Sequence, residues 1–217
     1  MTTRRFAVLA LLLPLRVALP LALLLASACR LLPAPRPEPA AFYTLGLPVP
    51  ESRGFGGRSL VVGLGPIKLP GYLDQTSLVR RLDDERIALQ PSARWASPLP
   101  RQFERALALR LMDALGAQDV VLFPWWPGQR IDVVVELTVL AFETDADGMA
   151  RLDAFWTMTR ARTSSVVGQG QARVREAVQG EGYGAGVAAL DRAVARLADA
   201  MADDLRHVPV SRATPGG

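Results

Sequence analysis

Residues 132–160 read DVVVELTVLAFETDADGMARLDAFWTMTR, and they carry the clearest structural signal in the 217-residue chain. The first part, 132–143, is rich in Val, Leu and Thr, a composition that favours a β-strand. Asp145-Ala146-Asp147-Gly148 then separates it from a second strand-like segment, 152–160. Because an Asp-Gly pair is typical of tight turns between antiparallel strands, the stretch predicts a β-hairpin.

The segments after this hairpin predict a third strand and a long helix. In residues 169–175 polar side chains alternate with small or apolar ones, so one face of this strand should meet water. In residues 183–205 apolar side chains recur every three or four positions, which is the spacing of an amphipathic helix. The side that we expect to be buried consists of Val187, Leu190, Val194, Leu197, Met201 and Leu205.

The segments before the hairpin predict three more strands and a second helix. Residues 60–64 form a short apolar strand that we expect Pro66 to end. Residues 77–82 and 86–89 predict two strands joined by a turn at 83–85. Residues 98–115 then change to helical spacing, and Gly116 is a suitable stop. The buried stripe of this helix should contain Phe103, Leu107, Leu111 and either Ala114 or Leu115.

Together these elements predict one α+β domain, similar to an α/β sandwich, over residues 59–207. We expect a mixed, largely antiparallel sheet packed against the two main amphipathic helices. Residues 208–217 contain Pro215 and end in Gly-Gly, and we expect a disordered tail there.

The 30 residues before this domain, 29–58, are rich in Pro and Gly and predict a tether. Proline occupies every second position from 33 to 39, which favours an extended backbone. At about 3.1 Å per residue, twelve such residues would reach about 37 Å from a membrane surface. Within this segment, residues 42–45 have the composition of a strand.

Residues 1–28 have the order of a secretory signal peptide. They contain three arginines and no Asp or Glu, and an apolar run at 17–25 is broken only by Pro20. Small residues at 26–28 then lead to Cys29, the only cysteine, and this junction resembles the lipobox of bacterial lipoproteins. It departs from the motif at Ala26, where leucine is usual.

The lipobox resemblance implies that Cys29 is joined to a diacylglycerol, becomes the first mature residue and is acylated on its amino group. Three hydrocarbon chains would anchor the protein permanently, since two membrane signals already suffice. Arg30 is not the aspartate that usually retains lipoproteins at the inner membrane, so we expect the outer membrane, periplasmic face. The alternatives are a plain cleaved signal with a free thiol and a retained transmembrane helix over 6–28, which Arg16 weakens.

Composition excludes several classes of function. Without residues 1–28, 22 basic residues face 21 acidic ones, so no overall positive field for nucleic acid remains. One cysteine and one histidine, His207, are too few for a zinc, haem or iron–sulfur centre. We therefore expect no metal, no cofactor other than the covalent lipid on Cys29, and no catalytic residues.

Several aromatic side chains lie in expected turns. Trp125 and Trp126 are bracketed by Pro124 and Pro127, and Tyr72 and Trp95 also stand beside Pro or Gly turns. Tryptophans in such places either cover the core or contact a partner or lipid. The sequence leaves both interpretations open.

Five segments, by their order and spacing, resemble the PqiC family of ABC-type transport auxiliary lipoproteins. They are FYTL (42–45), VGLGPIKLPGYLD (62–74), RWASPL (94–99), PW (124–125) and GY (182–183), the last before a long Ala-rich helix. The resemblance implies a periplasm-facing lipoprotein that works with membrane-anchored MCE proteins. In many such systems an ABC transporter or permease takes part, and phospholipid or another lipid moves between the inner and outer membranes.

We therefore expect a docking protein for an MCE assembly at the outer membrane. The candidate partner-binding residues are Tyr72, Asp74, Trp95 and Trp125. One alternative is a lipid-binding carrier with its own hydrophobic pocket, and another is a purely structural envelope lipoprotein. Assembly into a homo-oligomer is left open.

Overall fold

The computed structural model describes residues 39–46, 60–116 and 120–208. The predicted signal peptide, Cys29, most of the predicted tether and the tail from 209 lie outside these residues. Residues from Ala40 onward belong to one unit, and everything below concerns that unit.

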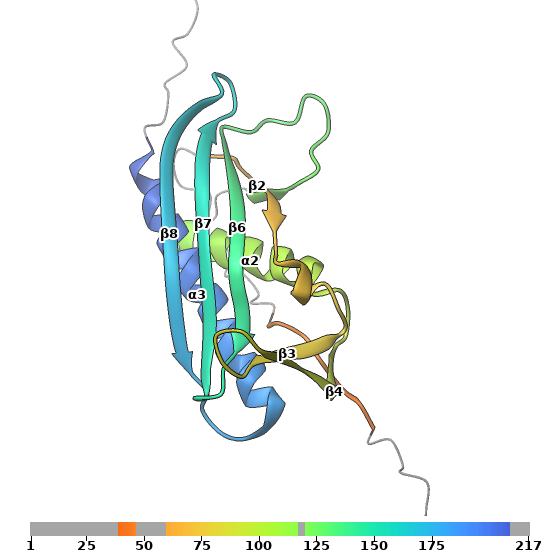
Figure 1. Ribbon diagram of the computed structural model, residues 1–217. Helices are drawn as coiled ribbons and strands as arrows, with labels where there is room; N and C mark the ends of the chain where they lie inside the picture. The colour runs from red at the N-terminus through yellow and green to blue at the C-terminus, as the bar shows by residue number, and fades with distance from the viewer. Residues whose placement is uncertain (1–38, 47–59, 117–119, 209–217) are drawn as a thin grey trace, which may run out of the picture. The chain divides into compact units, whose positions relative to one another are not determined.

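The domain is built on one open sheet of eight strands with two long helices, which confirms the α+β class (Figure 1). The strands are β1 (Ala41–Tyr43), β2 (Val62–Lys68), β3 (Ser77–Arg81), β4 (Ile87–Trp95), β5 (Val120–Leu122), β6 (Val133–Thr144), β7 (Met149–Arg160) and β8 (Ser165–Ala177). The helices are the short 3₁₀ turn η1 (Gly71–Leu73), α2 (Leu99–Leu115) and α3 (Gly182–His207).

Strands β6, β7 and β8 form an antiparallel meander, so the predicted hairpin at 132–160 is confirmed. Glu136 lies opposite Thr157, and Thr157 lies opposite Gln169 on β8. Gly148 closes the β6–β7 turn with φ of +77°, a backbone conformation that glycine adopts without steric cost. A β-bulge between Val139 and Ala141 interrupts the β6–β7 register.

The other edge of β6 is shared by two strands, which makes the sheet mixed. β2 runs parallel to the first half of β6, and β3 meets its end through the pair Arg80 and Thr144. β5 runs parallel to β2, and β1 runs parallel to β4. The longest pairings, β6 with β7 and β7 with β8, are antiparallel, and so is β3 with β4.

Two boundaries differ from the sequence predictions. Pro66 does not end β2, because the register shifts between Leu64 and Ile67 and the proline therefore occupies an irregularity, where no ladder hydrogen bond is required of it. β1 lies within the range 29–58 predicted as tether, and Ala96 donates its amide hydrogen to the carbonyl of Tyr43. The sheet thus includes residues before 59.

Both helices lie on the same side of the sheet, behind β6–β8 in Figure 1. Their predicted apolar stripes are buried, among them Phe103, Leu107, Leu111 and Leu115 on α2 and Val187, Leu190, Val194, Leu197, Met201 and Leu205 on α3. Inward side chains of β6 and β7 complete the core, and the ring of Phe142 meets that of Phe103 edge-on at 5.2 Å. Gly116 ends α2 in the left-handed conformation, as predicted.

Candidate functional site

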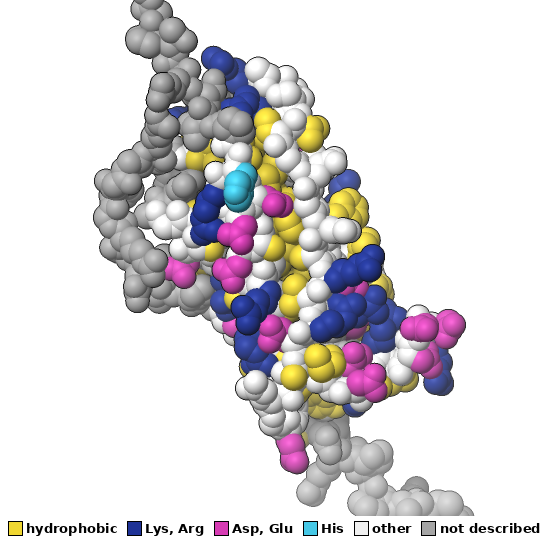
Figure 2. Space-filling view, turned by 90° about the vertical axis from the view of Figure 1, so that its left-hand side faces the viewer, with side chains coloured by type: hydrophobic (Ala, Val, Ile, Leu, Met, Phe, Trp, Pro, Cys, Tyr) yellow, Lys and Arg dark blue, Asp and Glu magenta, His cyan; other side chains and the backbone are white. Residues whose placement is uncertain are grey.

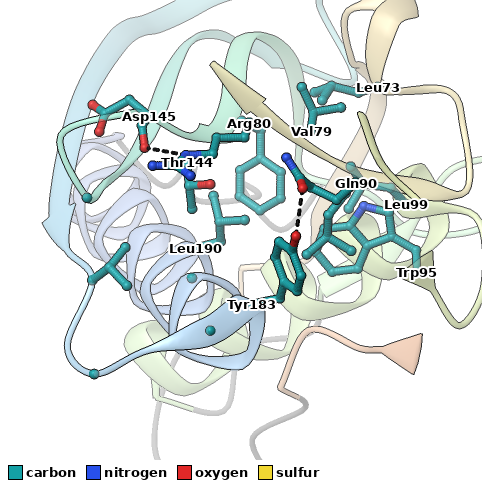
Figure 3. Close-up of a pocket in the computed structure, with 17 residues that line it drawn as sticks. Leu73, Val79, Arg80, Gln90, Trp95, Leu99, Thr144, Asp145, Tyr183 and Leu190 are labelled. Atoms are coloured by element: carbon teal, nitrogen blue, oxygen red, sulfur yellow. Dashed lines mark hydrogen bonds between the residues drawn. The ribbon is translucent and has the colours of Figure 1, made fainter. Parts of the chain in front are cut away.

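An apolar cavity of about 480 Å³ lies between the β3–β4 hairpin, the end of β6 and the first turns of α3 (Figure 3). Its walls include Leu73, Leu78, Trp95, Leu99, Phe142 and Leu190, none more than 6 % exposed. The volume falls within the range of about 300–1,000 Å³ that is usual for small-molecule sites. These side chains therefore enclose a space that the core itself does not fill.

Polar groups are placed around this cavity from three distant parts of the chain. Tyr183, in the first turn of α3, donates its hydroxyl hydrogen to Oε1 of Gln90 on β4 at 2.7 Å. Arg80 on β3 reaches the main-chain oxygens of Asp145 and Ala146 at 3.3 and 3.4 Å. The first contact ties α3 to the β3–β4 hairpin, and the second ties that hairpin to the β6–β7 turn.

A buried polar cluster adjoins the cavity through Glu143, the residue after the wall residue Phe142. The side chain of Glu143 is fully buried and accepts hydrogen bonds from Arg81 Nε and Tyr72 Oη, each at 2.7 Å. The main-chain amide of Phe142 donates a further bond of 2.8 Å to the same carboxylate. Burial, together with the neighbouring Glu143, raises the pKa of Tyr72 to about 12. The cluster links η1 and β3 to β6, and the hydroxyl hydrogen of Tyr72 is donated within it.

Three of the four candidate partner-binding residues lie in adjoining segments. Tyr72 belongs to η1, Asp74 is the exposed residue that ends it, and the amide of Trp95 donates to the carbonyl of Thr76 at 2.7 Å. Trp95 is only 5 % exposed and lines the cavity. Of these three residues, Asp74 alone is classed as exposed.

Trp125 belongs to a different region, the loop between β5 and β6. Its indole nitrogen donates to the carbonyl of Val121, and its ring covers Gly63 on β2, where an added Cβ would come within 2.8 Å of the ring. Glycine is required there by this close approach. Trp125 is thus half-buried against the sheet, with the ring of Phe123 edge-on at 5.2 Å.

The neighbouring Trp126 points outward and is 75 % exposed, and Phe123 is 47 % exposed. We call this pair the aromatic loop surface. The sequence identified the Trp125-Trp126 pair but did not separate the covering ring from the exposed one. Gly63 could have indicated that a ring covers this strand, because a glycine within a strand often marks a site that another group approaches closely.

A hydrophobic pocket was expected only under the lipid-carrier alternative, and its place in the fold was not predicted. The β3–β4 hairpin brings Arg80 and Gln90 to the cavity, and Tyr183 reaches it from α3, 93 residues after Gln90. Leu190 was predicted as an ordinary core residue, and the structure adds that it faces the cavity.

The sequence profile of the family described as "ABC-type transport auxiliary lipoprotein component" matches residues 43–202. This range runs from the end of β1 into α3 and contains every residue that lines the cavity. The chain belongs to the ABC-type transport auxiliary lipoprotein family. Membership makes it a component that accompanies an ABC transport system, in a family of lipoproteins, and it confirms the resemblance stated from the sequence.

Solved structures with the same fold bear little sequence similarity to this auxiliary lipoprotein. A crystal structure of an uncharacterized protein aligns with a TM-score of 0.65 and 20 % identity, over 77 % of this chain and 99 % of the other. A Xanthomonas campestris protein of family DUF330 aligns with a TM-score of 0.61 and 17 % identity, over 75 % and 93 % of the two chains. No curated protein matches the auxiliary lipoprotein sequence.

Three properties of the described residues concern metal ligands, membrane-spanning helices and surface charge. Among the described residues no three His, Cys, Asp or Glu side chains are placed to hold a metal ion. Within the same ranges, the structure contains no helix with the length and hydrophobicity needed to cross a bilayer. On the face shown in Figure 2, basic and acidic side chains are interspersed. Arg192 and Arg196 both pair with Glu176.

Proposed function

We propose that this auxiliary lipoprotein is a non-catalytic outer-membrane component that docks a periplasm-spanning MCE protein for phospholipid trafficking between the two membranes. The observation that carries the proposal is the family match over residues 43–202, a range that directly follows most of the proline-rich segment. An ABC transporter or permease would drive the system, and the present chain would serve as its attachment at the outer membrane.

Attachment depends on Cys29, which lies outside the described residues. Each buried methylene contributes about 0.8 kcal/mol to membrane binding, so three acyl chains would make release negligible. Labelled palmitate should enter the wild-type protein, and Cys29→Ser should abolish labelling and release the protein from envelope membranes. Unlabelled wild-type protein would contradict the lipid anchor.

For docking, the aromatic loop surface offers the most exposed aromatic side chain among the residues that the structure describes. Trp126 and Phe123 are both exposed in this loop, and Trp125 packs against Gly63 of β2. Exposed tryptophans held by a rigid support are typical of residues that dominate protein interfaces. The Tyr72 hydroxyl bonds Glu143, and the Trp95 ring is buried in the core. We therefore propose that these two side chains support the η1 turn, after which Asp74 faces solvent.

Co-purification with the MCE protein encoded beside this chain tests the function. We expect the wild-type lipoprotein to retain the MCE protein and Trp126→Ala to reduce its recovery at least fivefold. Phe155→Ala is the matched control, because Phe155 is also exposed, at 46 %, but lies on strand β7. No association with the MCE protein, together with an intact lipid distribution after gene deletion, would favour a purely structural envelope lipoprotein.

The cavity favours a second role within the same system, the binding of lipid by the domain itself. An apolar enclosure of about 480 Å³ is not needed for docking.

A further inference from the structure

The cavity between β3, β4, β6 and α3 is too large to be a packing irregularity. Protein interiors contain few voids larger than a water molecule. Apolar side chains that line an open cavity stay in contact with water unless something covers them, and covering apolar surface contributes about 25 cal/mol per Å². A space of about 480 Å³ is therefore best explained by a ligand that occupies it.

The lining has two chemically different ends (Figure 3). The charged side chains Arg80 and Asp145 lie at one end, and Leu73, Trp95 and Leu99 lie at the other. The lining also contains Phe142, Thr144 and Leu190, none of which is charged. An elongated ligand with a polar head and a long apolar body matches this order.

The charged end suits a head group that carries both signs of charge. Arg80 is exposed and forms no ion pair with any described residue, because its two contacts are long ones to main-chain oxygens. Asp145 uses Oδ1 to accept amide hydrogens from Asp147 and Met149, at 3.0 and 2.8 Å. Its other carboxylate oxygen accepts no hydrogen bond from the part of the chain that the structure describes. One cation and one anion thus stand at the same opening.

We propose that the cavity binds one acyl chain of a zwitterionic phospholipid, with the phosphate against Arg80 and the ammonium group toward Asp145. The guanidinium group suits phosphate because its N–H groups form a planar fork. The hydrogen bond between Tyr183 and Gln90 holds the first turn of α3 over the chain. This inference names the ligand for the proposed lipid-transport role and rests on it.

Photolabelling of the full-length lipoprotein tests the inference. The protein is reconstituted in vesicles of phosphatidylethanolamine and phosphatidylglycerol that carry a trace of phosphatidylethanolamine with a diazirine near the end of one acyl chain. After irradiation, the labelled peptides are identified by mass spectrometry. We expect label on the peptides that contain Phe142 and Leu190.

Two pairs of variants make the result specific. Val178→Trp should reduce label on these peptides at least fivefold, because Val178 lines the cavity and the indole would fill it. The control Val166→Trp introduces the same ring at an exposed position of β8 and should label like the wild type. Should Val178→Trp fail to fold, Leu78→Phe narrows the cavity from the opposite wall.

For the head group, Arg80→Gln should lower labelling about threefold or more, whereas Arg173→Gln, at an exposed position of β8, should not. Replacing the probe by a phosphatidylglycerol analogue should also reduce the label. Equal labelling of wild type and Val178→Trp, or equal labelling by both lipids, would overturn the assignment. MCE co-purification of Val178→Trp should remain normal, so that failure of this inference is distinguishable from failure of the docking function.

Discussion

The hydroxyl group of Tyr72 donates a hydrogen bond of 2.7 Å to Oε2 of the fully buried Glu143. The opposite oxygen of this carboxylate pairs with Arg81 Nε at the same distance. A single side chain of β6 thus holds both the η1 turn and β3, two of the segments that border the cavity. A buried carboxylate of this kind is stable only while its partners remain.

Glu143→Gln should destabilise the domain by about 3 kcal/mol, because it leaves the largely buried Arg81 without a counter-charge. Urea unfolding followed by circular dichroism measures the loss. Glu136→Gln changes the same residue type at an exposed position of the same strand and should stay within about 0.5 kcal/mol of wild type. Equal effects of the two substitutions would contradict a structural role of the cluster.

Tyr72 should make stability sensitive to alkaline pH. Its pKa is raised from 10.0 to about 12 in the folded domain by burial and by Glu143. Between these values the unfolded chain loses the phenolic proton that the folded domain retains, so stability is full below pH 10 and falls as pH rises toward 12. Absorbance titration should show one late-ionising tyrosine, which Tyr72→Phe removes. A late step that persists in that variant would assign it to another tyrosine.

Asp153 should contribute to stability in the opposite pH range. Burial would raise its pKa, but hydrogen bonds from Arg175 and Arg151 outweigh this and hold the pKa below 3.8. Its contribution is therefore present above pH 3.8 and lost as pH falls through the lower folded value. Asp153→Asn should lower the melting temperature at pH 7, and its difference from wild type should shrink in acid. Asp199→Asn, exposed on α3, should match wild type throughout.

Two glycines of β8 should respond differently to the same substitution. At Gly170 an added Cβ would overlap Trp156 and Asp204, whose carboxylate accepts the indole hydrogen of Trp156 at 3.1 Å. At Gly168 the nearest atom, Met158 Sδ, would lie at an ordinary 3.5 Å. Thermal unfolding should show a loss of about 1–3 kcal/mol for Gly170→Ala and little change for Gly168→Ala. Equal losses in stability for the two variants would mean that the Trp156 side chain moves aside without cost.

The sequence predicted elements whose pattern is local. The Asp-Gly turn at 148, the apolar stripe of α3 and the Gly116 stop each depend on neighbours within a few residues, and all three are confirmed. β5 was not predicted, because three residues carry too little periodicity to be recognised. The lipid anchor at Cys29 stays a prediction.

The site was predicted less well, because its parts meet only through strand pairing. Tyr72 and Trp95 were identified as aromatic residues beside turns. Whether such a ring is buried depends on which other segments pack against it, and the local sequence does not show this. The burial of Glu143 was not predicted, because an acidic residue at the end of a strand is usually exposed to water. Its burial follows from an irregularity of β6 that no composition rule reveals.

That irregularity is the bulge at Leu140, whose side chain is 58 % exposed. Beyond it, the alternation of β6 is displaced by one residue, so that Phe142 meets Phe103 while Glu143 meets Tyr72 and Arg81. If every residue from Val139 to Glu143 instead paired in turn with β7, these two side chains would exchange faces. The Phe142 ring would then lie beside the Arg81 guanidinium group, and the Glu143 carboxylate would lie in the apolar core. The one extra residue of the bulge thus decides which face of the sheet each later side chain of β6 occupies.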